Sequence, residues 1–156
     1  MQRRQFLQVT AGAAVLGPLL SAPLQAAEES ELIYLSPVKS DGNLSKCQAE
    51  VWFVQDGSDM YVVTDKSAWR SQAVMQGLTN TQVWVGDVGL WQRSNGKYKE
   101  LPSLMASASF ETNGARHAAL LTKFGAKYSR EWGTWGPRFK EGLANGSRVM
   151  LKYSPA

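Results

Sequence analysis

Short β-prone runs separated by turn residues constrain the fold of this chain more than any other feature of its sequence. Val, Ile, Tyr, Phe and Trp are concentrated in these runs, and the tetrapeptides "DGSD" and "SNGK" are strong hairpin signals. Short strands leave unpaired edges unless the sheet closes on itself, so the sequence predicts a mainly β (α+β) fold, a small antiparallel barrel. The segments predicted as strands or extended chain are 32–38, 50–55, 60–64, 82–85, 90–93, 97 onward and 147–155.

Two or three short helices are predicted between these strands. After Thr64 the apolar residues take helical spacing as far as Leu78, and Asp65 or Ser67 is a candidate N-cap. Residues 113–127 have helical composition. The segment 128–143 contains Trp132, Trp135 and Phe139 as aromatic anchors, but Gly133, Gly136 and Pro137 predict a broken or short helix. We expect its aromatic residues to form either a packed cap over a barrel end or a stacking platform for a substrate.

The chain is long enough for one domain. Its 156 residues are 44% hydrophobic, which suffices for one ordinary core. The formal net charge is +4, from 17 Lys and Arg against 13 Asp and Glu, and without Arg3 and Arg4 it would be 15 − 13 = +2. Such a small and scattered excess does not indicate a nucleic-acid-binding surface.

The first 27 residues have the layout of an export signal. A cationic start is followed by an apolar stretch that contains Gly and Pro, and then by small residues, with predicted cleavage after Ala26 or Ala27. The apolar stretch is too short to span a membrane. The run "RRQFL" at 3–7 resembles a twin-arginine signal, and the alternative is a general secretory signal. Residues 28–156 would then be a periplasmic domain, and the twin-arginine export machinery, which carries folded proteins, would be a partner.

Single copies of cysteine and histidine restrict the chemistry. Cys47 is the only cysteine, so the chain cannot form an intrachain disulfide. His117 is the only histidine and is either an ordinary surface residue or a general base or axial haem ligand. The sequence shows neither a metal-ligand cluster nor a Ser-His-Asp pattern, so an enzyme of this sequence would depend on a cofactor.

The segment Ala49–Gly89 carries a family resemblance. It contains a strand with an aromatic pair, an Asp-Gly turn, a strand ending in Thr, a helix start with Ser, Trp and Arg, and a Val-rich strand. This order resembles the split β-barrel proteins of the pyridoxamine 5'-phosphate oxidase-like and flavin-reductase-like families. Residues 123–153 look like the C-terminal part of small members. The resemblance implies a split β-barrel with two or three short helices and a homodimer.

The resemblance also implies a cofactor and its binding residues. The expected ligand is FMN or a deazaflavin, with haem as the alternative. Family members hold the cofactor phosphate where a strand meets a helix, which corresponds here to the stretch "TDKSAWR". The predicted cofactor-binding residues are Thr64, Lys66, Ser67, Trp69 and Arg70, with Lys66 and Arg70 as cations for the phosphate. The structural alternative is an ordinary helix start with solvated cations and with Trp69 in the core.

Three functional hypotheses remain open at this stage. The first is an exported flavin- or deazaflavin-binding oxidoreductase that acts on a small molecule. The second is a non-catalytic periplasmic ligand- or haem-binding protein of the same fold. The third is a structural or interaction module without a ligand.

Overall fold

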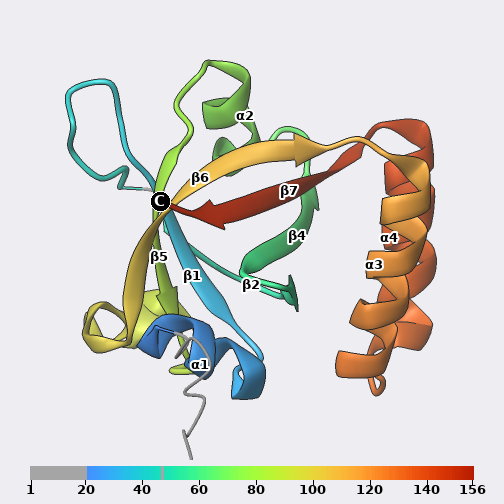
Figure 1. Cartoon of the computed structure of the whole chain (residues 1–156), viewed down its shortest axis with the longest axis horizontal. Helices are drawn as coiled ribbons and strands as arrows, with labels where there is room; N and C mark the ends of the chain where they lie inside the picture. Colours follow the sequence, from blue (N-terminus) through green and yellow to red (C-terminus); the bar gives the residue numbers. More distant parts are fainter. Residues whose placement is uncertain (1–20, 47) are drawn as a thin grey trace, which may run out of the picture.

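The computed structural model describes residues 21–46 and 48–156. One sheet of seven strands organises them, in the order β2-β1-β5-β6-β7-β4-β3, and every neighbouring pair is antiparallel (Figure 1). The sheet curls into a half-barrel, which confirms the predicted fold class. The strands are β1 (Ile33–Pro37), β2 (Ala49–Val51), β3 (Val54–Asp56), β4 (Asp59–Asp65), β5 (Asn80–Val85), β6 (Ser103–Glu111) and β7 (Arg148–Pro155).

A two-residue crossing links the two edges of this sheet. β2 and β3 are the edge strands, yet only Trp52 and Phe53 separate them in sequence. The backbone of Phe53 bonds to a side chain instead of a strand. Its N–H donates to the Tyr128 hydroxyl oxygen (2.9 Å), and the Tyr128 O–H lies 2.8 Å from its carbonyl oxygen. The predicted continuous strand 50–55 is therefore two strands, joined by a crossing from one edge of the half-barrel to the other.

The sheet separates two apolar layers because successive side chains of a strand point to opposite faces. On β4, Met60 and Val62 belong to the cluster inside the curl, whereas Tyr61 and Val63 belong to the cluster under helices α3 and α4. The β3–β4 hairpin turns at Gly57, whose φ of +62° is an unstrained backbone angle for glycine. The predicted "DGSD" hairpin is confirmed.

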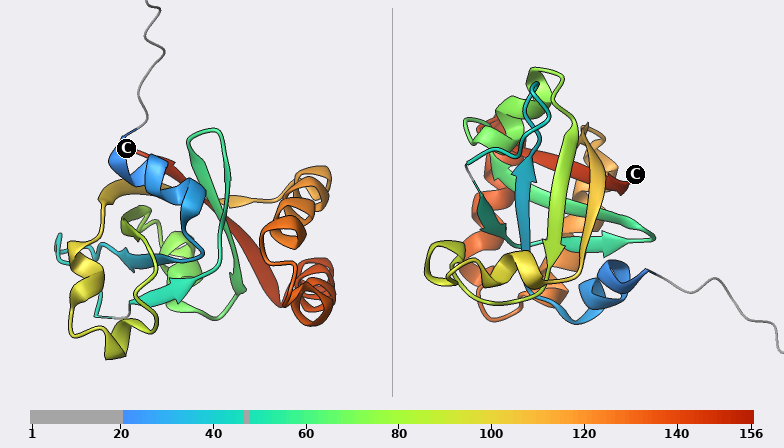
Figure 2. Two further views of the ribbon diagram at one scale, coloured as in Figure 1. Left: turned by 90° about the horizontal axis from the view of Figure 1, so that it is seen from below. Right: turned by 90° about the vertical axis from the view of Figure 1, so that its left-hand side faces the viewer.

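Four α-helices surround the sheet in the described residues, one or two more than predicted. They are α1 (Ala22–Glu29), α2 (Trp69–Met75), α3 (Gly114–Lys127) and α4 (Trp132–Asn145). α3 and α4 lie side by side on one side of the sheet, and α1 lies against β5 and β6 (Figure 2). No helix in the described part is long and apolar enough to cross a bilayer.

α1 occupies the end of the segment predicted to be an export signal. Leu24 and Ala27 are buried, and Ala27 belongs to the cluster inside the curl. The twin-arginine run lies outside the described residues, so the signal stays a prediction. Cleavage after Ala26 or Ala27 would remove most of a helix that contributes to the core.

The predicted hairpin at Asn95-Gly96 is wrong. Both residues have positive φ, as the turn signal requires, but they join the 3₁₀ helices η1 (Trp91–Arg93) and η2 (Lys97–Glu100). Tyr98 is 3% exposed and packs against Tyr34 (centroids 5.4 Å apart) and Trp84 (5.2 Å). Burial of this ring selects helical turns over the two strands that local chemistry favours.

The predicted limits of two helices also require correction. α2 begins at Trp69 behind an N-cap at Ala68, and no side chain caps it, so neither Asp65 nor Ser67 has that role. α4 is continuous through Pro137. Its Gly136, together with Gly125 of α3, leaves space for a packed indole ring, because a Cβ on either glycine would approach Trp132 within 3 Å.

Candidate functional site

The five predicted cofactor-binding residues do not converge on one cavity. Thr64 is 2% exposed, lies on the β4 face that turns into the curl, and its hydroxyl has no hydrogen-bond partner in the described part of the chain. Lys66 and Ser67 are exposed, and Lys66 lines a hollow beside α4. Trp69 donates its indole N–H to Ser45 (2.7 Å) and lines a different surface hollow.

Arg70 lies in the hollow with the most suggestive chemistry. This hollow has a volume of about 390 Å³, within the range of roughly 300–1,000 Å³ typical of small-molecule sites. We call it the Arg70–Arg148 pocket. Its lining residues are two arginines, three large aromatic residues, one glutamate and two valines: Arg70, Arg148, Trp52, Trp135, Phe139, Glu50, Val51 and Val63.

Packing fixes the aromatic wall of this pocket. The Trp52 ring stacks on Tyr128 with centroids 4.3 Å apart and an interplanar angle of 8°. Trp135 and Phe139 meet Trp52 edge-on, at 6.2 and 6.4 Å. Because Tyr128 also holds the Phe53 backbone, the crossing between β2 and β3 and the end of α3 together orient Trp52. The wall is therefore built before a ligand arrives.

Arg148 is positioned by rings and by a glycine. Its guanidinium carbon lies 5.4 Å from the Phe139 centroid and 5.9 Å from the Trp135 centroid, within cation–π range. Its side chain crosses Gly142, where an added Cβ would approach Arg148 Cδ at 2.6 Å. One of its terminal nitrogens is 3.6 Å from an Asp65 carboxylate oxygen. The aromatic rings and Gly142 thus position the guanidinium group at the pocket, and its ion pair with Asp65 is long.

The pocket carries more positive than negative charge. Besides the two arginines it contains Glu50, whose carboxylate accepts a hydrogen bond from the Trp91 backbone N–H (3.2 Å). Burial raises the pKa of the Tyr153 hydroxyl, and the positive charge of Arg70 partly opposes this shift. Two guanidinium groups beside a flat apolar wall suit a planar ligand with an anionic group.

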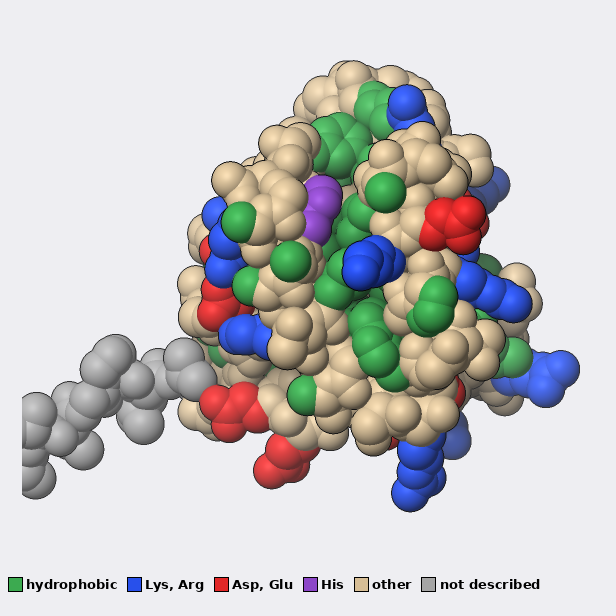
Figure 3. Space-filling model, turned by 90° about the vertical axis from the view of Figure 1, so that its right-hand side faces the viewer, with side chains coloured by type: hydrophobic (Ala, Val, Ile, Leu, Met, Phe, Trp, Pro, Cys, Tyr) green, Lys and Arg blue, Asp and Glu red, His purple; other side chains and the backbone are tan. Residues whose placement is uncertain are grey.

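A second hollow on the α3–α4 side contains the histidine (Figure 3). It is lined by His117, Lys66, Arg148 and two methionines, Met75 and Met150, among other residues. His117 Nε2 makes a hydrogen-bond contact with the Glu111 carbonyl oxygen. Arg148 borders both this hollow and the Arg70–Arg148 pocket. Within the described residues no group of three or more His, Cys, Asp and Glu side chains could hold a metal ion.

Comparison with known proteins identifies the architecture. No protein-family model and no curated protein matches the sequence. Solved structures do match. HutZ, the haem storage protein from Vibrio cholerae, is 15% identical, with a TM-score of 0.56 over 85% of this chain and 86% of that one. General stress protein 26 from Bacillus anthracis is 16% identical, with a TM-score of 0.55 over 86% of both chains.

The fold is a split β-barrel. A third match belongs to the pyridoxinephosphate oxidase family: a Clostridium acetobutylicum protein related to general stress protein 26, at 11% identity, TM-score 0.53, and coverage of 84% and 79%. The structural neighbours are thus of the type that the resemblance of Ala49–Gly89 indicates. At these identities they establish the fold, which is compatible with a flavin and with haem.

Sequence reasoning missed most of the split barrel's aromatic pocket. It assigned no pocket role to Trp52, whose half-buried side chain packs against the core and lines the pocket, and it gave no role to Arg148. The aromatic cluster of 128–143 was noticed, and the structure shows it packed on the outer face of the sheet. The prediction for Cys47 lies outside the described residues.

Proposed function

We propose that this chain binds a flavin mononucleotide-type cofactor in the Arg70–Arg148 pocket. The observation that carries the proposal is the juxtaposition of Arg70 and Arg148 with the rings of Trp52, Trp135 and Phe139 around one hollow of about 390 Å³. A guanidinium group matches a phosphate with paired N–H donors, and an aromatic wall matches an apolar ring system. The residues present therefore fit the cofactor.

The two arginines would hold the anionic tail and the aromatic rings would hold the flat part of the cofactor. Bound flavin would supply hydride transfer, which no side chain of this pocket can perform. Glu50 lies in the same hollow and repels a phosphate, which reduces affinity. Its carboxylate is held by the Trp91 N–H, so the repulsion acts from a fixed position.

As the wider role we propose an exported oxidoreductase that acts on a small molecule from the periplasm. The twin-arginine-like run supports this proposal, because export in the folded state allows a cofactor to be inserted before transport. We also propose that the protein forms a homodimer and that its cofactor is FMN and not a deazaflavin. Lys66 belongs to the adjoining hollow and adds a third cation near Arg148.

A second candidate is haem binding in the adjoining hollow. The observation that favours it is the placement of His117 in a hollow that also contains two cations, Lys66 and Arg148, suited to carboxylate groups. His117 Nε2 already contacts the Glu111 carbonyl, so the free ring nitrogen is Nδ1. The matching HutZ is described as a haem storage protein.

A comparison of FMN with riboflavin tests the first proposal. The two ligands share the ring and differ in the phosphate, so the difference in their affinities isolates the arginine contribution. We expect FMN to bind about 10- to 100-fold more tightly, since a hydrogen bond to a charged group contributes about 1.5–3 kcal/mol. Titration by quenching of flavin fluorescence measures both constants.

Variants then assign the contribution to residues. Arg70→Gln together with Arg148→Gln should bring the FMN and riboflavin affinities together, while Arg130→Gln, an exposed arginine that does not line the pocket, should leave the ratio unchanged. Near-ultraviolet circular dichroism checks that each variant is folded. Equal affinities in the unmodified protein would refute the phosphate assignment. A Soret band on adding haem, lost in His117→Ala, would select the second candidate.

A further inference from the structure

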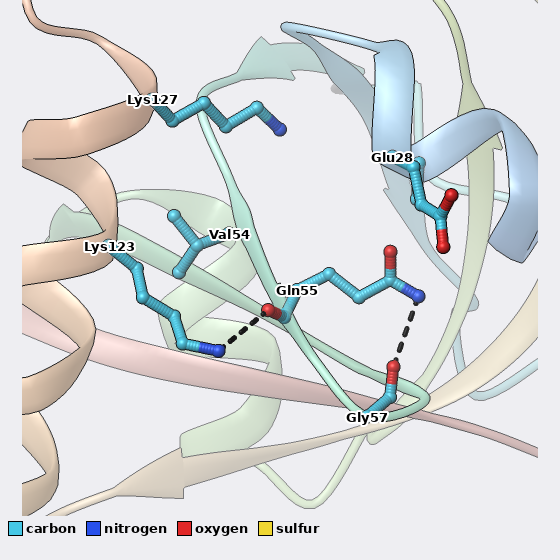
Figure 4. A pocket seen from close by; sticks show the side chains of 7 residues that line it. Glu28, Val54, Gln55, Gly57, Lys123 and Lys127 are labelled. Carbon is cyan, nitrogen blue, oxygen red and sulfur yellow. Dashed lines mark hydrogen bonds between the residues drawn. The ribbon is translucent and has the colours of Figure 1, made fainter.

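A hollow that shares no lining residue with the Arg70–Arg148 pocket contains two lysines with different surroundings (Figure 4). Its volume is about 450 Å³. We call it the Lys127 hollow. It is lined by Ala27 and Glu28 of α1, by Val54, Gln55 and Gly57 of the β3–β4 hairpin, and by Lys123 and Lys127 of α3. None of these residues lines the Arg70–Arg148 pocket, so the inference below does not depend on the proposed function.

The two lysine amines differ in their partners. Lys123 Nζ is 3.0 Å from an Asp56 carboxylate oxygen and 3.3 Å from the Gln55 carbonyl oxygen. Lys127 Nζ has no hydrogen bond or ion pair within the described residues. It instead lies 3.5 Å from the centroid of the Phe53 ring and 5.5 Å from that of Tyr128. One amine is neutralised by a carboxylate, and the other rests on aromatic carbon at the edge of a cavity.

Burial favours the uncharged form of Lys127. Desolvation lowers its pKa to about 8, and the Glu31 carboxylate opposes this shift. The other charged groups in the hollow are Glu28 and Lys123. Roughly a quarter of the Lys127 amines are then neutral at pH 7.5, against about one in a thousand for an amine with a pKa of 10.5. A neutral amine is the nucleophilic form.

The hollow also presents an unused acceptor. Gln55 donates its side-chain N–H to the Gly57 carbonyl oxygen (3.1 Å), which fixes the orientation of the amide. The remaining amide oxygen, Oε1, is buried and has no hydrogen-bond partner in the described residues. Figure 4 shows the Gln55 amide, the Glu28 carboxylate and the Lys127 amine facing the same hollow. A ligand that supplies a hydroxyl donor would satisfy it.

We propose that Lys127 captures a small hydroxylated aldehyde in this hollow as an imine. The Nζ lone pair forms a bond to the aldehyde carbon, the carbonyl oxygen leaves as water, and a carbon–nitrogen double bond remains. The amine loses its two protons to that water, so no oxidant or reductant is required. The hydroxyl group of the aldehyde donates to Gln55 Oε1. Lys123 stays bound to Asp56 and is the internal control.

Reductive trapping with glycolaldehyde tests the proposal. The whole protein is incubated at pH 7.5 with glycolaldehyde and cyanoborohydride, which reduces the imine to a stable secondary amine, and the modified lysines are mapped by mass spectrometry. Lys127 should be labelled about tenfold or more faster than Lys123, because its amine has a substantial neutral fraction and faces the hollow, whereas the Lys123 amine is paired with Asp56. The Lys127→Arg variant keeps the positive charge and should lose the fast labelling. The Lys123→Arg variant should retain the fast labelling of Lys127. Even labelling of both lysines, or fast labelling that survives in Lys127→Arg, would overturn the capture.

The acceptor is tested with a second aldehyde. Propionaldehyde has a similar length but no hydroxyl. For each aldehyde, the labelling rate of Lys127 is divided by the labelling rate of Nα-acetyl-lysine. We expect the protein to favour glycolaldehyde about 2- to 10-fold, as one hydrogen bond of about 0.5–1.5 kcal/mol implies. Gln55→Met should remove this preference and leave propionaldehyde capture intact. A preference that persists in Gln55→Met would show that Gln55 does not read the hydroxyl.

Discussion

Three glycines of α3 and α4 allow a sharp test of the packing between these helices, because only two of them face the Trp132 ring. An added Cβ at Gly136 would lie 2.8 Å from the Trp132 ring, and one at Gly125 would lie 2.7 Å from its indole nitrogen. At Gly133, in the same helix as Gly136, a Cβ would have no neighbour within 4 Å. The ring cannot easily move away, because it stacks with Phe124. Alanine substitutions at Gly133 and Gly136 should therefore have opposite effects.

The magnitudes follow from two competing effects. Gly→Ala inside a helix stabilises by about 0.5–1 kcal/mol through backbone entropy, so Gly133→Ala should raise the free energy of unfolding by that amount. Gly136→Ala gains the same but overpacks the indole, which costs typically 1–3 kcal/mol. The two variants should differ by about 1–3 kcal/mol, and at roughly 3–5 °C per kcal/mol the midpoints of thermal unfolding should separate by about 3–15 °C. Urea unfolding and thermal scans measure the difference.

A double-mutant cycle identifies the cause. In a Trp132→Leu background the ring is gone, so Gly136→Ala should become neutral or stabilising, like Gly133→Ala. Trp132→Leu itself loses the contacts with Phe124 and Phe139, and that loss cancels within the cycle. If Gly136→Ala is as stabilising as Gly133→Ala in the unmodified chain, or if its cost persists without the indole, the packing argument is wrong.

Two further predictions concern polar contacts that hold the barrel. Tyr128→Phe leaves the buried Phe53 N–H without its acceptor and should lower the free energy of unfolding by about 1–3 kcal/mol, measured in urea, and an unchanged value would show that this bond does not hold the crossing. The hydrogen bond from Arg116 is the main cause that lowers the pKa of Asp56 below its ordinary value of 3.8. The Asp56 carboxylate therefore stabilises the fold at pH values above its unfolded pKa of about 3.8. This contribution is lost as the pH falls through the lower pKa of the folded state. Asp56→Asn should therefore reduce the loss of stability between pH 5 and 2 in acid titrations of unfolding, roughly the window expected for such a pair, and an identical acid profile would refute the assignment.

The strands and the fold class could be predicted from the sequence because their signals are local. The β3–β4 hairpin follows from an Asp-Gly turn between β-rich runs, and the structure places Gly57 at positive φ there. The curled antiparallel arrangement follows from the need to pair short strands. The same reasoning from local sequence failed at Asn95-Gly96. There a contact between residues distant in sequence determines the secondary structure, because the buried ring of Tyr98 packs on Tyr34. A turn signal fixes the backbone angles of two residues and leaves the flanking structure open.

The candidate site depended on the tertiary structure to a larger extent. A stretch such as "TDKSAWR" offers a hydroxyl, cations and a ring, but consecutive residues point to different sides of a strand end and a helix start. Only Arg70 reaches the aromatic pocket, and it meets Arg148 there across 78 residues of sequence. Lys127 likewise has no local signal, because its amine meets the Phe53 ring, on the crossing between β2 and β3, only in the folded chain.

The sequence by itself determined that the chain would form short antiparallel strands with hairpin turns and a curled sheet, because periodicity and turn chemistry act over a few residues. It also determined which chemical groups were available. The tertiary structure alone decided which of them meet: two arginines at a wall of three aromatic rings, and one lysine amine on an aromatic face beside an unused amide oxygen. The physical reason is that burial and contact between distant residues arise only when the sheet closes and the helices pack on it.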